Sequence, residues 1–277
     1  MRFPKYIGVL PVVFLTALIM PAEVFSDQTT IHFTSLDNHP YNLSGTLYLP
    51  KSAPAPCPAV VMVHGTMGID SRGALYLGPI LKAGIAVFEV DFKTGVYTTP
   101  LNRPKPDVLV PMGFAALKEL RKLPAIDPAR IGIMGFSMGG HLAVCTAFES
   151  NRKLWMGSEK GFATHVGFYP VCKTFIKQKD LQMTGAPMII FYGTEDSYGD
   201  GKAVPELKSL LLKKDQFELT TVEYAGAMHG FNRNAPPISY LDPAATHMRG
   251  RMAYDENATN DSLSKVVAFL RQSLAVK

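Results

Sequence analysis

Apolar runs of strand length alternate along the chain with stretches of helical period. The runs that suit buried strands are 58–64, 84–91, 130–136, 165–170, 186–193 and 217–225. The stretches of helical period lie near 72–83, 107–123, 138–149, 202–214 and 259–275. This alternation is typical of βαβ units, in which helices connect parallel strands. The pattern predicts an α/β fold with a mostly parallel central sheet and helices on both faces.

Two strand-like segments precede this alternation. They are "TTIHFTSLD" (29–37) and "LSGTLYLPK" (43–51), and Asn38 and Pro40 between them are typical turn residues. A turn of this kind joins antiparallel strands. We therefore expect an antiparallel N-terminal strand pair beside the parallel sheet.

Residues 1–26 have a pattern of their own. Basic residues open the segment, an apolar stretch runs from Tyr6 to Met20, and the small residues Val24 and Ser26 follow it. This pattern is that of a secretory signal peptide, and the apolar stretch is shorter than the roughly 20 residues that span a membrane. We expect residues 27–277 to form a single domain, without stable membrane insertion, in a secreted or periplasmic protein.

Charge and cysteine content restrict the partners. The 277 residues include 28 Lys and Arg and 23 Asp and Glu, for a net charge of +5. The basic residues are scattered and form no stripe interleaved with aromatic residues, so we expect no nucleic-acid partner. Cys57, Cys145 and Cys172 allow at most one disulfide, and their spacing does not name the pair. The pattern does not indicate an oligomeric state.

One serine lies between glycines in "GIMGFSMGGHLAV" (132–144). Residues Gly135 to Gly139 match G-x-S-x-G, and they stand between a predicted strand and a predicted helix. In that context a sharp turn lifts the serine hydroxyl above the sheet, and side chains at the two glycine positions would collide. Ser137 could instead be the N-cap of its helix. We predict that it is a nucleophile.

A serine nucleophile needs a base within hydrogen-bond reach and a third group that orients the base. Asp196 follows the predicted strand in "APMIIFYGTEDSYGD", and His229 follows the next predicted strand in "VEYAGAMHGF". Both lie downstream of Ser137, in the chain order acid and then histidine. Glu195 and Asp200 compete with Asp196 for the role of the acid, and we assign it to Asp196.

Two backbone N–H groups are expected to bind the oxyanion, because such donors are fixed before the reaction. Met138, directly after the serine, supplies one, and we assign the other to Thr66 in "HGTMG". His64 precedes this loop and is expected to order it. His141, one helical turn beyond Ser137, is expected to pack beside the turn rather than act as the base. The histidines show no paired spacing, so we expect no metal.

Two connections are longer than a tight loop. They are residues 92–106 and residues 232–257, and each carries several apolar or aromatic residues, such as Tyr97, Tyr240 and Met248. Segments of this length in a compact domain are usually either walls of a functional site or disordered. We expect ordered pocket walls.

The stretches "VMVHGTMG", "DPARIGIMGFSMGGHLA", "MIIFYGTEDSY" and "MHGF" resemble the α/β-hydrolase superfamily and, within it, the dienelactone hydrolase family. The similarity runs from about Leu43 to Leu274. It implies the α/β-hydrolase fold, a small-molecule ester substrate and no cofactor. Enzymes of the family that open dienelactone carry a cysteine as nucleophile, whereas this chain has Ser137. The resemblance therefore implies a serine carboxylesterase that works through an acyl-enzyme.

Two other functions use the same scaffold. One is a binding protein without catalysis, since a fold alone does not define a function. The other is a peptidase or amidase. Three chemically matched groups at three separate strand ends favour an enzyme over a binding protein.

Overall fold

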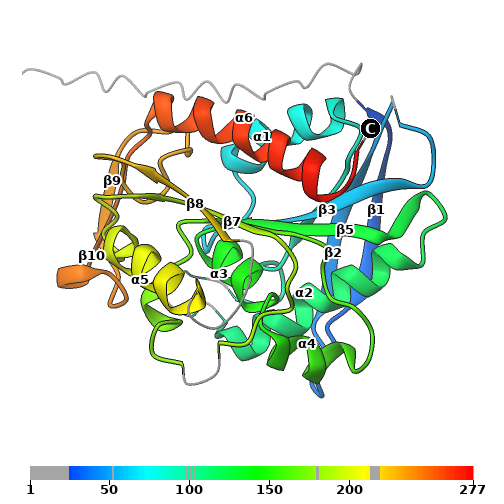
Figure 1. Cartoon of the computed structure of the whole chain (residues 1–277), viewed down its shortest axis with the longest axis horizontal. Helices are drawn as coiled ribbons and strands as arrows, with labels where there is room; N and C mark the ends of the chain where they lie inside the picture. Colours follow the sequence, from blue (N-terminus) through cyan, green and yellow to red (C-terminus); the bar gives the residue numbers. More distant parts are fainter. Residues whose placement is uncertain are drawn as a thin grey trace, which may run out of the picture.

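An eight-stranded sheet lies at the centre of the computed structural model, which describes residues 25–51, 53–97, 99, 102, 104–178, 181–212 and 219–276 (Figure 1). The predicted signal peptide lies outside the described residues, except for the backbone of its last two positions. The strands are β1 (Phe25–Thr34), β2 (Asn42–Pro50), β3 (Cys57–Val63), β4 (Ala86–Asp91), β5 (Ile126–Phe136), β6 (His165–Phe168), β7 (Met188–Gly193) and β8 (Leu219–Tyr224).

The spatial order of the strands is β1-β2-β4-β3-β5-β6-β7-β8. β1 pairs with β2 and β2 pairs with β4 in antiparallel fashion, and all pairs from β4 to β8 are parallel. The predicted N-terminal pair is thus confirmed, and it forms one edge of the same sheet. The parallel pairs bring the carboxyl ends of β3, β5, β7 and β8 to one edge of the sheet, where the connections that carry the predicted site residues begin.

Helices cover both faces of the sheet, as predicted. α1 (Ser71–Lys82) and α6 (Glu256–Ser273) lie on one face (Figure 1). The opposite face carries α2 (Pro106–Arg121), α3 (Met138–Cys145), α4 (Glu149–Met156) and α5 (Asp200–Leu212). Among the described residues, no helix has the length and apolar character needed to cross a membrane.

The core consists of two layers, one on each side of the sheet. All seven residues of β3 are buried, and their side chains alternate between the layers. Val61 and Val63 pack toward α2 and α3, whereas Val60 and Met62 pack toward α1 and α6. Because successive side chains of a strand point to opposite faces, a strand covered on both sides must be apolar throughout. This requirement explains the continuous apolar runs in the sequence.

The structure differs from the sequence prediction in two places. The helix expected over 138–149 ends at Cys145, and α4 follows as a separate helix from Glu149. The long connection 232–257 contains a second, two-stranded antiparallel sheet of β9 (Ile238–Leu241) and β10 (Arg249–Met252). Each of these strands has only four residues, which is too short for a clear alternation of polar and apolar positions to show in the sequence.

Candidate active site

Ser137 lies at the sharp turn between β5 and α3. Its φ of 54° is unusual for a residue other than glycine, and its side chain makes no capping hydrogen bond to α3. The turn is held on both sides. The Ser137 N–H donates to the carbonyl of Phe168 on β6 at 3.0 Å, and the Ser137 carbonyl accepts the N–H of His141 at 2.8 Å. These bonds fix the position of the serine hydroxyl.

The two glycines that flank this turn allow β5 and α3 to approach closely. A Cβ atom on Gly135 would lie 2.3 Å from the backbone of Gly139. A Cβ atom on Gly139 would lie 2.3 Å from the carbonyl oxygen of Val63 on β3. No side chain fits at such distances, since the atoms it would meet belong to the backbone and cannot move aside cheaply. The glycines of the sequence motif are therefore a steric requirement of the turn.

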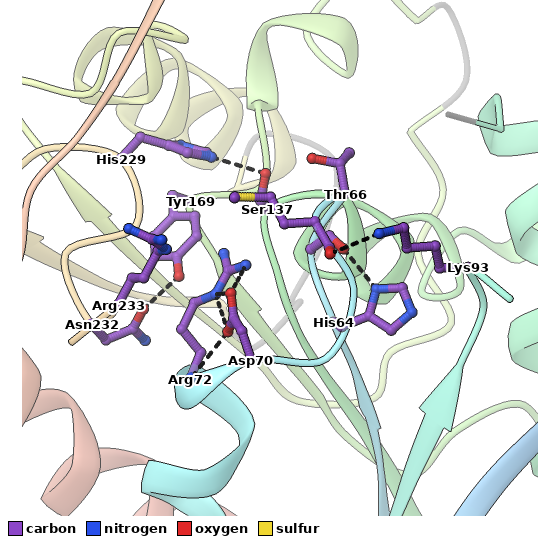
Figure 2. Close-up of polar contacts among 12 residues, drawn as sticks. His64, Thr66, Asp70, Arg72, Lys93, Ser137, Tyr169, His229, Asn232 and Arg233 are labelled. Carbon is purple, nitrogen blue, oxygen red and sulfur yellow. Dashed lines mark hydrogen bonds and ion pairs between the residues drawn. The ribbon is translucent and has the colours of Figure 1, made fainter. Parts of the chain in front are cut away.

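His229 connects Ser137 to Asp196. Its Nε2 lies 2.8 Å from Ser137 Oγ (Figure 2), and its Nδ1 lies 2.8 Å from Asp196 Oδ2. Because a carboxylate only accepts hydrogen bonds, Nδ1 carries the imidazole proton and Nε2 accepts from the serine hydroxyl. The side chains of His229 and Asp196 are both buried. The structure thus brings together the three residues that the sequence selected.

The other two acidic candidates are not part of this hydrogen-bonded chain. Glu195 is exposed to solvent. Asp200 is fully buried, and burial together with the negative charge of Asp196 raises its pKa. The second oxygen of Asp196, Oδ1, accepts the N–H of Tyr198 at 2.7 Å, so both oxygens of this carboxylate are occupied. This geometry favours Asp196 as the partner of the histidine.

Two tyrosines enclose the ring of His229. The Tyr169 ring lies 4.6 Å away at an interplanar angle of 61°, and the Tyr198 ring lies 4.4 Å away at 49°. Such contacts keep the imidazole in one rotamer and exclude water from it. Neither tyrosine could be selected from the sequence, because a single aromatic residue near a strand end carries no distinctive signal.

His64 orients the peptide bond between Gly65 and Thr66. The Nδ1 of His64 donates to the carbonyl of Gly65 at 2.6 Å (Figure 2). The proton is on Nδ1 because Nε2 accepts the N–H of Phe92 at 3.0 Å. In a trans peptide the carbonyl and the following N–H point in opposite directions. Fixing the Gly65 carbonyl therefore also fixes the direction of the Thr66 N–H. This is the ordering role expected for His64.

The connection after β4 supports the same loop. The Lys93 ammonium donates to the carbonyl of Met67 at 3.2 Å (Figure 2). The Tyr97 hydroxyl donates to the carbonyl of Thr66 at 3.1 Å. Part of the connection 92–106 thus braces the loop around Thr66 rather than only lining a pocket.

A cavity of about 270 Å³ opens beside Ser137. Thr66 and Met138 line it together with the serine. Pro104 from the first long connection and Asp242 from the second also line it, so both connections form pocket walls as predicted. A larger surface hollow of about 840 Å³ surrounds other residues, such as Arg121 and Arg152, and shares none with this cavity.

The β9–β10 pair holds the loops that carry Asp196 and His229. Arg251 on β10 donates its N–H to the Ser197 hydroxyl at 3.1 Å, and Thr246 donates its N–H to the Ser197 carbonyl at 2.7 Å. The next residue of β10, Met252, forms an isolated parallel bridge with His229. One short sheet therefore contacts both loops.

A buried polar network connects the segment after His229 to α1. Arg72 on α1 forms a paired hydrogen bond with Asp70, with N–O distances of 2.8 and 2.7 Å (Figure 2). The Tyr169 hydroxyl donates to Asn232, whose amide donates to the Tyr76 hydroxyl at 3.0 Å. The network ties the His229 segment to α1. Tyr169 and Asn232 lie far in the sequence from the α1 residues of the network, so no local pattern indicates it.

Comparison with known proteins assigns the chain to a family. Residues 43–274 match the model of the dienelactone hydrolase family. This chain belongs to the dienelactone hydrolase family. The match covers the sheet from β2 onward and all six described helices up to the end of α6, so it includes every residue of the site described above.

Individual relatives of this dienelactone hydrolase family member are distant. Esterase FrsA from Photorhabdus laumondii is 21% identical over 232 residues, which cover 71% of this chain and 55% of that protein. An acetylxylan esterase from Xylanibacter ruminicola is 30% identical over 136 residues, which cover 47% of this chain and 27% of that protein. The chain thus spans about half or less of the length of these relatives.

The fold is shared with a solved structure. A crystal structure of a putative dienelactone hydrolase from Klebsiella pneumoniae covers 89% of this chain and 100% of its own, with a TM-score of 0.63 and 16% sequence identity. At this identity the likeness shows the fold alone. It confirms the α/β-hydrolase fold that the sequence resemblance implied.

The described residues of this family member hold neither a metal-ligand cluster nor a disulfide. Within the described ranges, no group of three or more His, Cys, Asp or Glu side chains is arranged to hold a metal ion. Cys57, Cys145 and Cys172 are free and buried. Burial raises the pKa of the Cys145 thiol to about 12, so this thiol is not a nucleophile at neutral pH.

Proposed function

We propose that this protein is a serine hydrolase that cleaves carboxylic esters through an acyl-enzyme intermediate. The hydrogen-bonded chain from Ser137 through His229 to Asp196 carries the proposal. A serine, an imidazole and a buried carboxylate in this order activate a hydroxyl for attack on a carbonyl. Membership of the dienelactone hydrolase family and the similarity to two esterases support ester hydrolysis.

The site geometry leads to a two-step reaction. Ser137 Oγ attacks the ester carbonyl while His229 Nε2 takes its proton, and the imidazolium then gives that proton to the leaving alcohol. A water molecule next attacks the acyl-enzyme, with His229 again as base, and releases the acid and the free serine. Asp196 keeps the proton on Nδ1 and stabilises the imidazolium that forms in both steps.

The negative oxygen of each tetrahedral intermediate needs fixed donors. We assign the N–H groups of Met138 and Thr66 to this role. Met138 is the first residue of α3, where N–H groups have no partner within the helix. Thr66 lines the same cavity, and its N–H direction is set by the bond from His64 to Gly65. Each donor of this kind typically contributes roughly 100-fold to 1000-fold in rate.

Cavity size favours a small ester over an extended peptide. The cavity of about 270 Å³ is below the range of about 300–1,000 Å³ that is usual for drug-sized ligands. A peptidase on this scaffold would need a cleft for several residues of substrate. Comparing the turnover of a matched ester and amide separates an esterase from an amidase.

We also propose that the protein is exported, to the periplasm or the medium, through a signal peptide at residues 1–26. The supporting observation is the order of basic residues, apolar stretch and small residues in this segment.

A fluorophosphonate probe tests the chemistry. We expect it to modify Ser137 stoichiometrically and to abolish the turnover of aryl esters, whereas Ser137→Ala takes up no label. Iodoacetamide is the control reagent, and it should leave turnover nearly intact because the three cysteines are buried. A folded protein that takes up no phosphonate and turns over no ester would instead favour the non-catalytic binding function.

A further inference from the structure

His141 borders the cavity beside the proposed nucleophile. It lies one turn beyond Ser137 on α3, and its N–H donates to the Ser137 carbonyl at 2.8 Å. Its side chain lines the same cavity of about 270 Å³. The mechanism above gives this residue no task, since the base position at Ser137 Oγ is taken by His229.

The ring of His141 is held in one orientation. Its Nδ1 lies 3.0 Å from the carbonyl oxygen of Pro170. A carbonyl oxygen only accepts hydrogen bonds, so Nδ1 must carry the proton. The ring is also stacked on Phe175, with the ring centres 4.4 Å apart and an interplanar angle of 18°. A ring fixed at one nitrogen and along one face cannot turn when a substrate binds.

The opposite nitrogen is an acceptor without a protein donor. Burial lowers the pKa of His141 to about 4, so the ring is neutral at pH 7. With the proton on Nδ1, the Nε2 atom has a lone pair. Among the described residues, no side chain or backbone group donates to it. His141 is only half-buried and its Nε2 is open to solvent, so an occupant of the cavity that offers a donor can replace solvent at this atom.

The charge around the cavity favours a neutral donor. Asp242 lines the wall and is buried, and it accepts the Tyr198 hydroxyl at 2.8 Å and the Ala244 N–H at 2.9 Å. Its negative charge disfavours a carboxylate in the cavity. Lys105 also lines the cavity, but it is exposed to solvent, so water and salt screen its charge more strongly than that of Asp242.

We propose that His141 selects esters with a hydroxyl group close to the scissile carbonyl, by accepting a hydrogen bond from that hydroxyl at Nε2. The inference rests on the proposed esterase function and adds a substrate class to it: small, neutral hydroxy esters. The hydroxyl can belong to the acyl part or to the alcohol part of the ester, and the two sources are separated by experiment.

Two matched pairs of esters test the inference, because a hydroxyl and a methyl group differ little in size. Ethyl glycolate and ethyl propionate place the difference in the acyl part. 2-Hydroxyethyl acetate and propyl acetate place it in the alcohol part. Acid release at constant pH gives kcat/KM for all four esters. The measured quantity is the ratio of kcat/KM for the hydroxy ester to that for its methyl partner.

His141→Asn is the informative variant. Its amide reaches the position of Nδ1 and can still donate to Pro170, but it has no atom at the position of Nε2. We expect the ratio of one pair to fall about tenfold relative to the wild type, which is the usual value of one hydrogen bond, while kcat/KM for the methyl ester stays within about twofold. The pair that responds identifies whether the acyl or the alcohol part carries the hydroxyl.

Two further variants serve as controls. His141→Gln can place its amide oxygen near the position of Nε2, and it should keep most of the preference. If His141→Asn does not fold, His141→Phe keeps the stack on Phe175 and provides the same comparison. Unchanged ratios for both pairs, in a variant that still hydrolyses the methyl esters, overturn this inference alone. If wild-type protein hydrolyses none of the four esters, the proposed function fails and this inference fails with it.

Discussion

Asp200 Oδ2 accepts the backbone N–H of Val171 at 2.9 Å, and Val171 has a φ of 58°. A β-branched residue in this conformation is strained. The other oxygen, Oδ1, accepts the N–H of Cys172 at 2.6 Å, so one buried carboxylate holds two successive peptides of the turn after β6. Val171 lines the cavity beside Ser137. Asp200 therefore shapes the cavity wall, whereas Asp196 orients the histidine.

Because Asp196 and Asp200 have different roles, replacement by asparagine should have different effects at the two positions. Asp196→Asn would place an amide against the protonated Nδ1 of His229 and favour the wrong tautomer. We expect kcat to fall by about 10⁴-fold, less than the about 10⁶-fold expected for Ser137→Ala. Asp200→Asn should lower kcat far less. Its main effect should be a loss of about 1–3 kcal/mol in unfolding free energy, because one backbone N–H loses its acceptor.

Steady-state kinetics and urea unfolding of both variants provide the check. A nearly normal kcat in Asp196→Asn, together with a severe loss of kcat in a folded Asp200→Asn, would show that the acid is assigned to the wrong residue.

The glycines around Ser137 should not tolerate a methyl group. Gly135→Ala and Gly139→Ala each place Cβ 2.3 Å from backbone atoms, so we expect a loss of several kcal/mol in stability, or failure to fold. Gly167→Ala on β6 is the matched control, since its Cβ would meet its nearest neighbours at 3.5 Å, an ordinary contact. Thermal unfolding of the three variants decides the matter. Equal melting temperatures would contradict the steric argument.

His64→Ala should reduce the rate more than the affinity. Without the imidazole, the Gly65 carbonyl keeps only the Gly68 N–H as a donor, at 3.0 Å, so the Thr66 N–H is held less firmly in one direction. Because a whole oxyanion donor is worth roughly 100-fold to 1000-fold, we expect a partial loss, with kcat about tenfold lower and KM little changed. The exposed histidine His32 on β1 supplies the control variant His32→Ala. An increase in KM at constant kcat would argue against this positioning role.

Acid should destabilise the protein through buried histidines. Burial lowers the pKa of His165 from the usual 6.5 to about 3, so between these values the unfolded chain binds a proton that the folded protein does not. Stability therefore falls as pH drops below about 6.5. For this one group, linkage predicts a loss of about 2 kcal/mol between pH 7 and pH 5.

His165→Leu removes the titrating group at this position. Urea unfolding at pH 7 and pH 5 should show a smaller loss for the variant than for the wild type, by about 2 kcal/mol. His141, whose pKa is lowered to about 4, adds to the loss in both proteins. Identical losses would mean that His165 is not the source.

Export predicts a defined N-terminus. We expect secreted or periplasmic material to begin near Asp27, because a signal peptidase reads small residues such as Val24 and Ser26. A chain that starts at Asp27 retains the pairing of Asp27–Thr34 with Asn42–Leu49. N-terminal sequencing of the exported protein checks this. Material that retains residues 1–20 would rule the cleavage out.

The sequence predicted those parts of the protein in which local chemistry and spacing carry the information. The continuous apolar run of β3 is required by burial on both faces. The glycines around Ser137 are required by the close approach of β5 and α3. Asp196 and His229 could be selected because residues after parallel strands meet at one edge of the sheet.

Other parts of the site depend on contacts between distant segments. The stacking of His141 on Phe175 and the packing of Tyr198 against His229 leave no local pattern. The same holds for the position of Arg72, whose guanidinium lies 5.9 Å from the ring centre of Phe136 on β5. The four-residue strands β9 and β10 were missed because they are shorter than the window in which a period can be recognised.

The small β9–β10 sheet also limits how this chain can vary in length. Surface connections usually tolerate insertions and deletions well. Here, however, Arg251 and Met252 are neighbours in the chain, and they contact Ser197 beside the acid and His229 itself. An added or lost residue in β10 would shift one contact relative to the other and change the spacing between acid and base. The length of β10 is therefore fixed, because its two contacts set the position of Asp196 relative to His229.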